Sequence, residues 1–160
     1  MAVSGDKDMH ELFVMAKWGA MLLPPKGRLS VIEVSDLARL LLTLAQDTTQ
    51  SINATYEVDD GTPSGWSHAD FAQAVGHAVG RNRVFAVPLP RALVQIGARV
   101  DRLIRGKNAR LTPDRASYIC HPDWVSRPDM APPTALWHAQ IPTPQGLAAT
   151  TAAYRNKGWL

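Results

Sequence analysis

The sequence predicts an α/β fold in which short strands alternate with about five helices. Two patterns predict it: short β-branched runs that favour strands, and longer segments with apolar residues at helical spacing, bounded by residues typical of helix ends. The chain has 160 residues, of which 46% are hydrophobic and 19% charged. This composition is typical of a folded globular protein, and the length is sufficient for one hydrophobic core. We therefore expect residues 1–160 to form a single domain.

The first part of the chain is expected to contain two helices and one strand. Residues 8–18 carry apolar side chains at helical spacing and are followed by a glycine, which predicts a helix that ends there. Residues 22–27 hold two prolines and a glycine and are expected to form a loop. Residues 29–34 predict a strand because three of them are β-branched, and Ser35 is expected to cap the helix that follows, which runs to Leu44.

The middle of the chain continues the alternation. Residues 55–58 predict a second strand, closed by the turn Asp59-Asp60-Gly61. The pair Ser67 and Asp70 is typical of a capping box, which predicts a helix from residue 68. Residues 84–87 predict a third strand, bounded by prolines.

Three helices are expected in the last part. Residues 91–105 carry apolar side chains on one face and arginines on the opposite face, as in an amphipathic helix. Thr112-Pro113-Asp114 and Thr143-Pro144 are both typical helix starts, since a threonine cap precedes a proline at the first helical position.

Few residue patterns point to catalysis or metal binding. Cys120 is the single cysteine, so an internal disulfide is impossible and a reducing compartment is expected. A lone cysteine is more often a buried, inert thiol than a nucleophile. His121 lies beside Cys120 and close to Asp123, but neighbouring residues rarely converge on one metal ion. The sequence contains no Gly-x-Gly-x-x-Gly loop and no Gly-x-Ser-x-Gly elbow.

The sequence also bears on location. No apolar stretch is long enough to cross a bilayer, and the first residues lack the pattern of a signal peptide. We therefore expect a cytoplasmic protein with no membrane partner.

Basic residues concentrate between Arg81 and Arg115, where nine lysines and arginines face two acidic residues in a chain of net charge +3. Such a cluster is compatible with nucleic-acid binding. However, the arginines of residues 91–105 occupy the face opposite the apolar one, as on a solvated surface, and no aromatic residues alternate with them for base stacking. A basic nucleic-acid-binding α/β domain is therefore the least favoured interpretation.

Several segments, taken in order, resemble parts of one enzyme family. Residues 28–38 are similar to the family segment Arg-x-x-x-Ile-His-Val-x-Asp-Leu-Ala, although Glu33 stands at the histidine position. Gly5-Asp6 and the helix after it resemble the family's Gly-Pro-Gly-Asp turn and helix, and residues 56–61 resemble the last parallel strand of its nucleotide-binding sheet. Residues 136–159 are similar to its closing Leu-Gly-Trp-x-Pro…Gly-Leu-x-x-Thr…Trp-Tyr-Arg pattern. The family is that of the NAD(P)-dependent epimerases and dehydratases of the extended short-chain dehydrogenase type, and the resemblance covers nearly the whole chain.

The resemblance implies that residues 1–160 are the C-terminal, substrate-binding lobe of such a protein, with the nucleotide-binding Rossmann half absent. A complete family protein uses NAD or NADP on a nucleotide-sugar-like substrate, and we expect neither cofactor to bind this chain alone. The family's Tyr-x-x-x-Lys pair and Gly-rich loop do not occur in the sequence. Hence no catalytic, cofactor-binding or metal-binding residue is assigned, and whether the chain is an enzyme stays open.

Four substrate-binding candidates follow from the resemblance. Arg28 matches the family arginine that contacts substrate phosphates, and a surface arginine after a glycine turn is the equally supported alternative. Asp36 matches the family aspartate, although its place at a helix N-terminus gives it a structural role as well. Arg110 and Asp123 lie in the region that closes over the substrate in the family.

Three interpretations are thus compared. The first is a C-terminal fragment of an NAD(P)-dependent epimerase/dehydratase or reductase, inactive alone; the second is a stand-alone binding or interaction module derived from that lobe; the third is the nucleic-acid-binding domain. For the first two we expect a homo-oligomer, or a separate chain that supplies the missing N-terminal half, because an open strand edge at residues 55–58 would require a partner.

Overall fold

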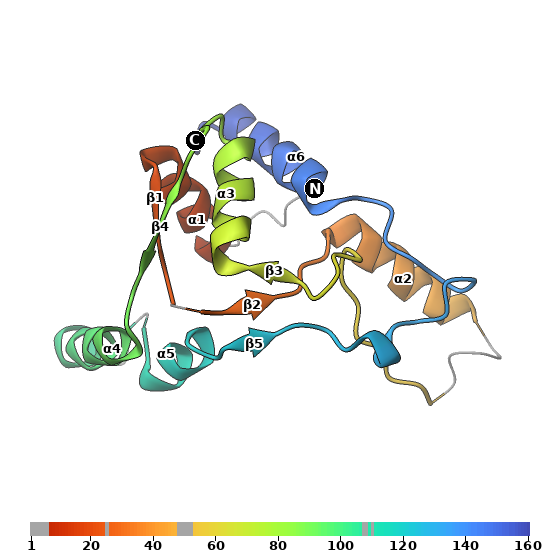
Figure 1. The fold of residues 1–160 in the computed structure, drawn as a ribbon, viewed down its shortest axis with the longest axis horizontal. Coiled ribbons are helices and arrows are strands. Elements are labelled where there is room, and N and C mark those ends of the chain that lie inside the picture. The colour runs from red at the N-terminus through yellow and green to blue at the C-terminus, as the bar shows by residue number, and fades with distance from the viewer. Residues whose placement is uncertain (1–6, 25, 48–52, 107–108, 110) are drawn as a thin grey trace.

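The computed structural model describes residues 7–24, 26–47, 53–106, 109 and 111–160. Within them the chain is a mixed α/β protein with six α-helices and five short strands (Figure 1). In chain order the elements are α1 (Lys7–Trp18), β1 (Ala20–Leu23), β2 (Arg28–Leu29), α2 (Val34–Gln46), β3 (Trp66–Ser67), α3 (His68–Ala78), β4 (Phe85–Pro88), α4 (Arg91–Arg105), α5 (Pro113–Ile119), β5 (Asp123–Trp124), the 3-10 turn η2 (Pro128–Met130) and α6 (Thr143–Asn156).

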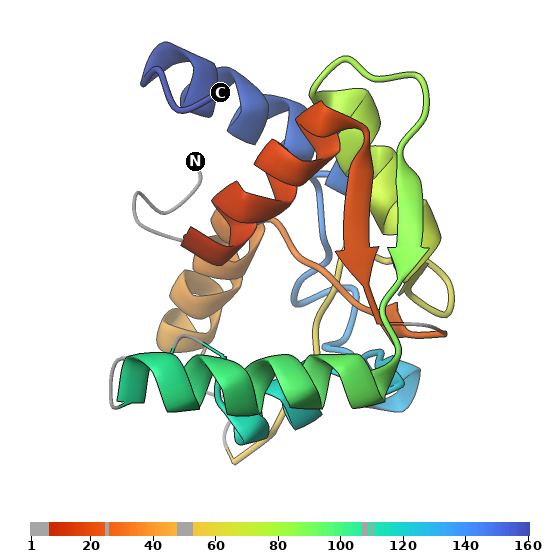
Figure 2. The ribbon, with the colours of Figure 1, turned by 90° about the vertical axis from the view of Figure 1, so that its left-hand side faces the viewer.

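The main core lies behind a two-stranded parallel sheet of β1 and β4. Helices α1 and α3 cover one face of this sheet, as Figure 2 shows, and α6 packs against α3. Met21 points from β1 into this core, where it meets Phe13 of α1, Phe71 and Val75 of α3 and Tyr154 of α6. Side chains on opposite faces of a strand alternate, so Leu22, next to Met21, lies on the uncovered face.

A second, three-stranded sheet has the order β3-β2-β5. The central strand β2 pairs antiparallel with β3 and parallel with β5, so that Arg28 faces Ser67 on one side and Asp123 on the other. This sheet brings the residues after β5 next to those after β2, and the candidate site is built at that junction.

Helices α4 and α5 pack on each other at one corner of the molecule (Figure 1). Their contact is small, with Val94, Ala98 and Ala116 as its buried residues. The apolar face of α4 that the sequence predicts consists of other residues, and these are exposed. They are between 47% and 86% accessible: Leu93, Ile96, Val100, Leu103 and Ile104. The arginine face is also exposed, so α4 is solvated on both sides of a narrow buried strip.

The helices predicted from the sequence are confirmed, but two of their caps differ. Ser67 caps α3 and Thr112 caps α5 as predicted. Glu33, not Ser35, caps α2, since its carboxylate accepts the Ser35 amide at 2.5 Å. Thr143 is the first residue of α6 and not its cap, and its hydroxyl donates to Asp60.

The strand predictions are less successful, although the strand predicted at 84–87 is confirmed as β4. Residues 22–27 are not wholly a loop, because Leu22 and Leu23 belong to β1 and pair with β4. The predicted strand at 29–34 is limited to a two-residue pairing at Arg28–Leu29.

The predicted strand at 55–58 is wrong. Residues 55–58 have no strand assignment. The Glu57 amide donates to the Met130 carbonyl and the Asp60 amide, beyond the predicted strand, donates to the Val31 carbonyl, but these are isolated bonds and not a ladder. The open strand edge on which the expectation of self-association rests is therefore absent from these residues.

Candidate functional site

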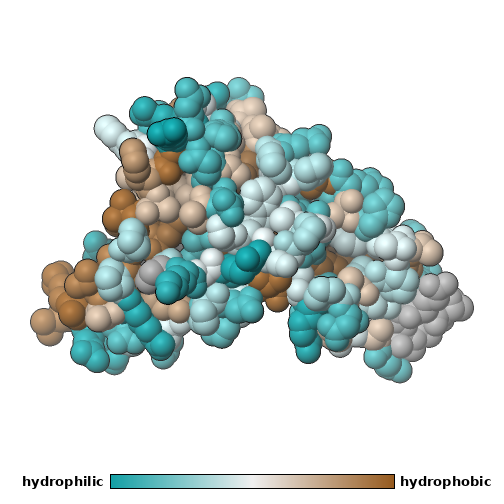
Figure 3. Space-filling model, in the orientation of Figure 1, coloured by the Kyte–Doolittle hydropathy of each residue, from teal (hydrophilic) through white to brown (hydrophobic). Residues whose placement is uncertain are grey.

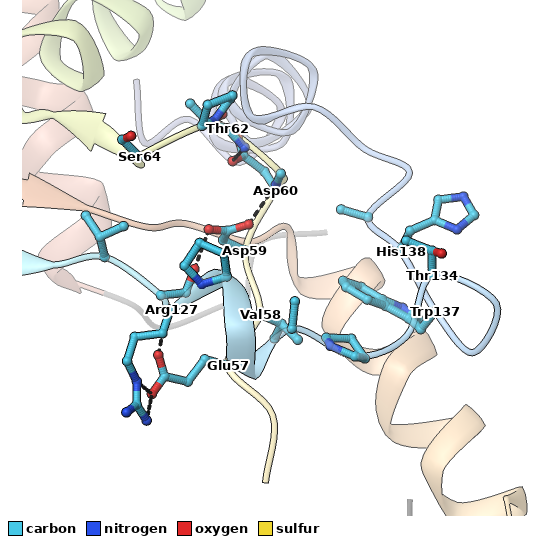
Figure 4. Close-up of a pocket in the computed structure, with 18 of the residues that line it drawn as sticks. Glu57, Val58, Asp59, Asp60, Thr62, Ser64, Arg127, Thr134, Trp137 and His138 are labelled. Carbon is cyan, nitrogen blue, oxygen red and sulfur yellow. Dashed lines mark hydrogen bonds and ion pairs between the residues drawn. The ribbon is translucent and has the colours of Figure 1, made fainter. Parts of the chain in front are cut away.

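A cleft of about 730 Å³ opens beside β2 and β5. Its walls are the loop that precedes β3, the segment after β5, and the segment that leads toward α6 (Figure 4). The lining residues are Arg28, Glu57, Val58, Asp59, Asp60, Gly61, Thr62, Pro63, Ser64, Asp123, Val125, Ser126, Arg127, Pro128, Ala131, Pro132, Thr134, Trp137, His138 and Ala139. Its volume is within the range of small-molecule sites.

The parallel pairing of β2 with β5 places Arg28 opposite Asp123, and both line the cleft. Two of the four substrate-binding candidates are therefore brought together. The guanidinium of Arg28 donates to the carbonyl oxygens of Ser64 at 2.7 Å and Gly65 at 3.1 Å. Arg28 thus holds the loop 62–65 in place, and its donors are directed to the wall of the cleft.

Gly65 allows the loop 62–65 to lie close to Leu29 and Val125. Its φ of +63° lies in the left-handed region, and a Cβ there would stand 2.8 Å from the Leu29 carbonyl oxygen and 2.9 Å from Val125 Cγ2. Only glycine meets both conditions without strain.

Asp59 ties three segments of the cleft together. One of its carboxylate oxygens accepts the hydroxyls of Ser30 at 2.8 Å and Ser126 at 2.5 Å, and the other accepts the Gly61 amide at 2.8 Å. Figure 4 shows this carboxylate in the middle of the wall. Asp59 consequently fixes the loop against the segment after β5.

Asp60 is the partly buried neighbour. It accepts hydrogen bonds from the Trp66 indole at 3.0 Å, the Thr62 amide at 3.0 Å and the Thr143 hydroxyl. Burial raises the pKa of Asp60, but these hydrogen bonds, that from Thr143 foremost, outweigh burial and leave the pKa below its ordinary value. The carboxylate is therefore ionised and anchors the start of α6.

Glu57 and Arg127 form an ion pair at the outer edge of the cleft. Arg127 Nη2 and Nε donate to one carboxylate oxygen at 2.7 and 2.9 Å, and the Arg127 amide donates to the other at 2.7 Å. The side-chain hydrogen bonds lower the pKa of Glu57 and raise the pKa of Arg127. Like Arg28, Arg127 is thus directed to an acceptor of the protein itself.

Trp137 closes one end of the cleft (Figure 4). The side chain is 5% exposed, and the Arg39 guanidinium lies 5.2 Å from the centre of its ring. Among the described residues, its Nε1 is a buried donor with no hydrogen-bond partner. A buried polar group without a partner is costly, so the burial of this indole N–H is unfavourable.

The lining is acidic overall. It contains four carboxylates, on Glu57, Asp59, Asp60 and Asp123, against two guanidiniums. Both guanidiniums already bond to the cleft's own acceptors. The cleft therefore attracts neutral or cationic groups more than phosphates.

The other two candidates from the sequence lie elsewhere. Asp36 does not line the cleft; it is 1% exposed and accepts the Arg39 side chain at 2.5 Å and the amides of Gln140 and Ile141 at 2.8 Å each. Burial raises the pKa of Asp36, but the hydrogen bond from Arg39 and those from the two amides bring it below its ordinary value. Arg110 lies outside the described residues.

Most of the cleft's polar residues were not singled out by sequence reasoning. The sequence predicts a turn at Asp59 and Asp60, and they form one. No sequence pattern marks Ser126, Arg127 or His138 as site residues. The run Asp59-Asp60-Gly61 is the one local hint, because two adjacent carboxylates in a turn can serve two different neighbours.

Other chemistry finds little support in the described part of the chain. It contains no group of three or more histidine, cysteine, aspartate or glutamate side chains that could hold a metal ion. His121 Nδ1 accepts the Asp123 amide at 3.2 Å, and the His121 ring packs on Trp124. None of the helices described here is both long and apolar enough to cross a bilayer.

Comparison with known proteins gives no assignment. No protein-family model matches the chain, and no curated protein matches its sequence.

Proposed function

We propose that this chain is the substrate-binding lobe of an NAD(P)-dependent epimerase/dehydratase of the extended short-chain dehydrogenase type, and that its cleft binds the sugar-like part of the substrate. The observation that carries the proposal is the cleft itself, in which Arg28 and Asp123 lie opposite each other. The mixed α/β architecture is compatible with such a lobe. In this proposal the redox chemistry belongs to NAD or NADP and to groups other than the residues described above.

The polar groups of the cleft suit a ligand rich in hydroxyls. Asp123 is exposed and accepts the Val125 amide with Oδ1, so its carboxylate has further capacity to accept from a ligand hydroxyl. Ser64 and Thr134 also line the cleft and can both donate and accept.

The same lining disfavours phosphate. Because four carboxylates outnumber two engaged guanidiniums, a diphosphate inside the cleft would meet net repulsion. We therefore assign Arg28 to the shape of the cleft, through its bonds to the loop carbonyls, and place the phosphates of a nucleotide-sugar-like substrate outside it.

The test is a titration of the full chain, followed by NMR or calorimetry, with glucose, UDP-glucose and UDP. We expect glucose and UDP-glucose to bind and UDP alone to bind more weakly than UDP-glucose. Asp123→Asn should weaken glucose and UDP-glucose by roughly 10- to 100-fold, the loss expected for a hydrogen bond to a charged group. The amide keeps an oxygen for the Val125 amide, so the local turn is retained.

Asp129→Asn is the matched control, because Asp129 is exposed in η2 but does not line the cleft. Both variants remove one negative charge from the same region. If the two variants weaken glucose binding equally, the cleft does not recognise the sugar. The same conclusion holds if UDP alone binds as tightly as UDP-glucose. Absence of binding by all three compounds would also refute the proposal.

A second candidate, a stand-alone interaction module, is favoured by one specific observation. The exposed apolar residues of α4 form a surface of a kind that partners usually cover.

A further inference from the structure

Helix α4 carries a stripe of exposed apolar side chains in addition to its buried strip. Its members are Leu93, Ile96, Val100, Leu103 and Ile104, spaced so that all fall on one side of the helix. Leu103 and Ile104 are 86% and 76% exposed. The contact with α5 uses Val94 and Ala98 instead, so within the described part of the chain the side chains of this stripe remain half to mostly exposed.

The stripe continues onto the uncovered face of the β1–β4 sheet. Leu22 and Val87 pair in register, and both are exposed, as is Phe85 next along β4. Trp18, 82% exposed, lies just before β1. Figure 3 shows hydrophobic residues gathered along the side of the molecule where Figure 1 places β1, β4 and α4. We call these nine residues the α4–β4 surface.

Charge separates this region from the rest of the chain. Residues 17–23 and 81–105, which contain the whole surface, hold seven basic residues and one acidic residue, a net charge of +6. The whole chain is +3, so the remaining residues carry −3. Arg91, Arg99, Arg102 and Arg105 are all exposed on α4. Because arginine side chains are long and flexible, their guanidiniums can reach anionic groups that lie beside the stripe.

This charge decides between possible partners. A second copy of the chain, docked through the same surface, would bring two clusters of +6 together, which is unfavourable. Nucleic acid would satisfy the arginines but would leave aliphatic leucine and isoleucine side chains with no apolar partner. A negatively charged lipid surface satisfies both, since it offers anionic headgroups and, just beneath them, acyl chains.

We propose that the α4–β4 surface docks on an anionic lipid membrane. Helix α4 lies in the plane of the headgroups with Leu103, Ile104 and their neighbours directed into the acyl boundary, while the arginines extend toward the headgroups. The helix is short for a span and does not cross the bilayer. The expectation from the sequence of no membrane partner rests on the absence of a span, which interfacial binding does not need.

The test is co-sedimentation of the full chain with vesicles of phosphatidylcholine alone or with about 30 mol% phosphatidylserine. We expect binding to the anionic vesicles, at least tenfold weaker binding to the neutral ones, and release as salt is raised. Leu103→Ser combined with Ile104→Ser should lower the affinity at least tenfold, because two exposed apolar side chains can then no longer be buried. Since both side chains are solvent-exposed, the double variant should fold as the parent does.

The control is Leu41→Ser combined with Leu42→Ser on α2, which removes two exposed leucines, 59% and 66% accessible, from another face. It should leave vesicle binding unchanged. Equal loss in both double variants would mean non-specific adsorption, and equal binding to neutral and anionic vesicles would contradict the role of the arginines. If the chain binds no vesicles but forms a dimer or binds an oligonucleotide, and the Leu103→Ser and Ile104→Ser changes abolish that binding, the surface has a different partner and the proposal is wrong.

Discussion

Asp36 accepts hydrogen bonds from the Arg39 side chain and from the backbone amides of Gln140 and Ile141. It therefore joins the start of α2 to the segment before α6, and this segment also carries Trp137 and His138 of the cleft. The family resemblance gives Asp36 a place near the substrate. The contacts give it a structural role, in which it supports one wall of the cleft from behind.

We predict that Asp36→Asn lowers the free energy of unfolding by about 2–3 kcal/mol, because two partly buried amides and one guanidinium lose a charged acceptor. The pH dependence has a defined sign. The pKa of Asp36 is lowered in the folded protein, so its contribution is present above the unfolded-state value, about 3.9, and is lost as the pH falls through the folded-state value. Urea unfolding of parent and variant across pH should show that the difference between their free energies of unfolding becomes smaller below about pH 4. A gap independent of pH would contradict this role, and Asp129→Asn provides the exposed control.

Gly65 and Gly61 provide a matched pair of glycines in the cleft loop. Both have positive φ, +63° and +79°, but a Cβ would clash with the Leu29 carbonyl at Gly65 and meet nothing within 4 Å at Gly61. We predict that Gly61→Ala costs about 1 kcal/mol of stability from backbone strain, and that Gly65→Ala costs at least 1 kcal/mol more. Thermal unfolding of the two variants measures the difference. Equal costs would mean that the close contact between Gly65 and Leu29 relaxes freely.

At the scale of elements, helices could be predicted from the sequence and strands mostly could not. Helix signals are local: Ser67 and Thr112 cap the residues that directly follow them, and both caps are present as predicted. The strands described here are two to four residues long, and each pairs with a partner distant in sequence, as β2 pairs with β5. Of the three predicted strands, only the one at 84–87 is confirmed as predicted, in β4. Residues 55–58 have a strand-like composition, but they form no strand, and the Glu57 amide makes an isolated bond to the Met130 carbonyl.

The same reasoning explains what could be predicted of the site. The resemblance proposed Arg28 and Asp123 as site residues, and the strand register places them opposite each other. The network of Asp59 with Ser30 and Ser126 depends on loops meeting in space, for which no spacing in the sequence gives a signal.

The helix caps allow a direct comparison. Ser67 Oγ accepts the Asp70 amide at 3.0 Å and donates to the Asp70 carboxylate at 2.6 Å, whereas Ser35 follows the true cap of α2, Glu33. We predict that Ser67→Ala lowers stability by about 1 kcal/mol and that Ser35→Ala changes it by no more than a few tenths. Chemical denaturation of the two variants tests this. A larger loss at Ser35 would restore the cap expected from the sequence.

At the scale of the whole molecule, the structure divides into two parts of unequal size. The main core joins α1, α3, α6 and the β1–β4 sheet through nine buried residues, while α4 and α5 share a cluster of three. A helix that buries few side chains and exposes many has little tertiary stabilisation. The same feature that leaves the stripe of α4 open to a partner therefore makes this part of the molecule easier to unfold.

We predict that α4 and α5 open as a unit without global unfolding. In native-state hydrogen exchange, the amides of α4 should exchange with a lower opening free energy than those of α3 and α6, because opening the pair breaks only the small cluster of Val94, Ala98 and Ala116 and the few side chains packed on it. The variant Phe71→Leu in the main core distinguishes local opening of α4 and α5 from global unfolding. It should lower the opening free energy of α3 by about 1 kcal/mol and leave that of α4 unchanged. If the variant lowers both by the same amount, α4 opens only when the whole protein unfolds. Repeating the measurement with anionic vesicles should raise the opening free energy of α4 but not of α3, since vesicles that bind only the closed helix stabilise it by an amount that grows with the logarithm of the vesicle concentration above the dissociation constant.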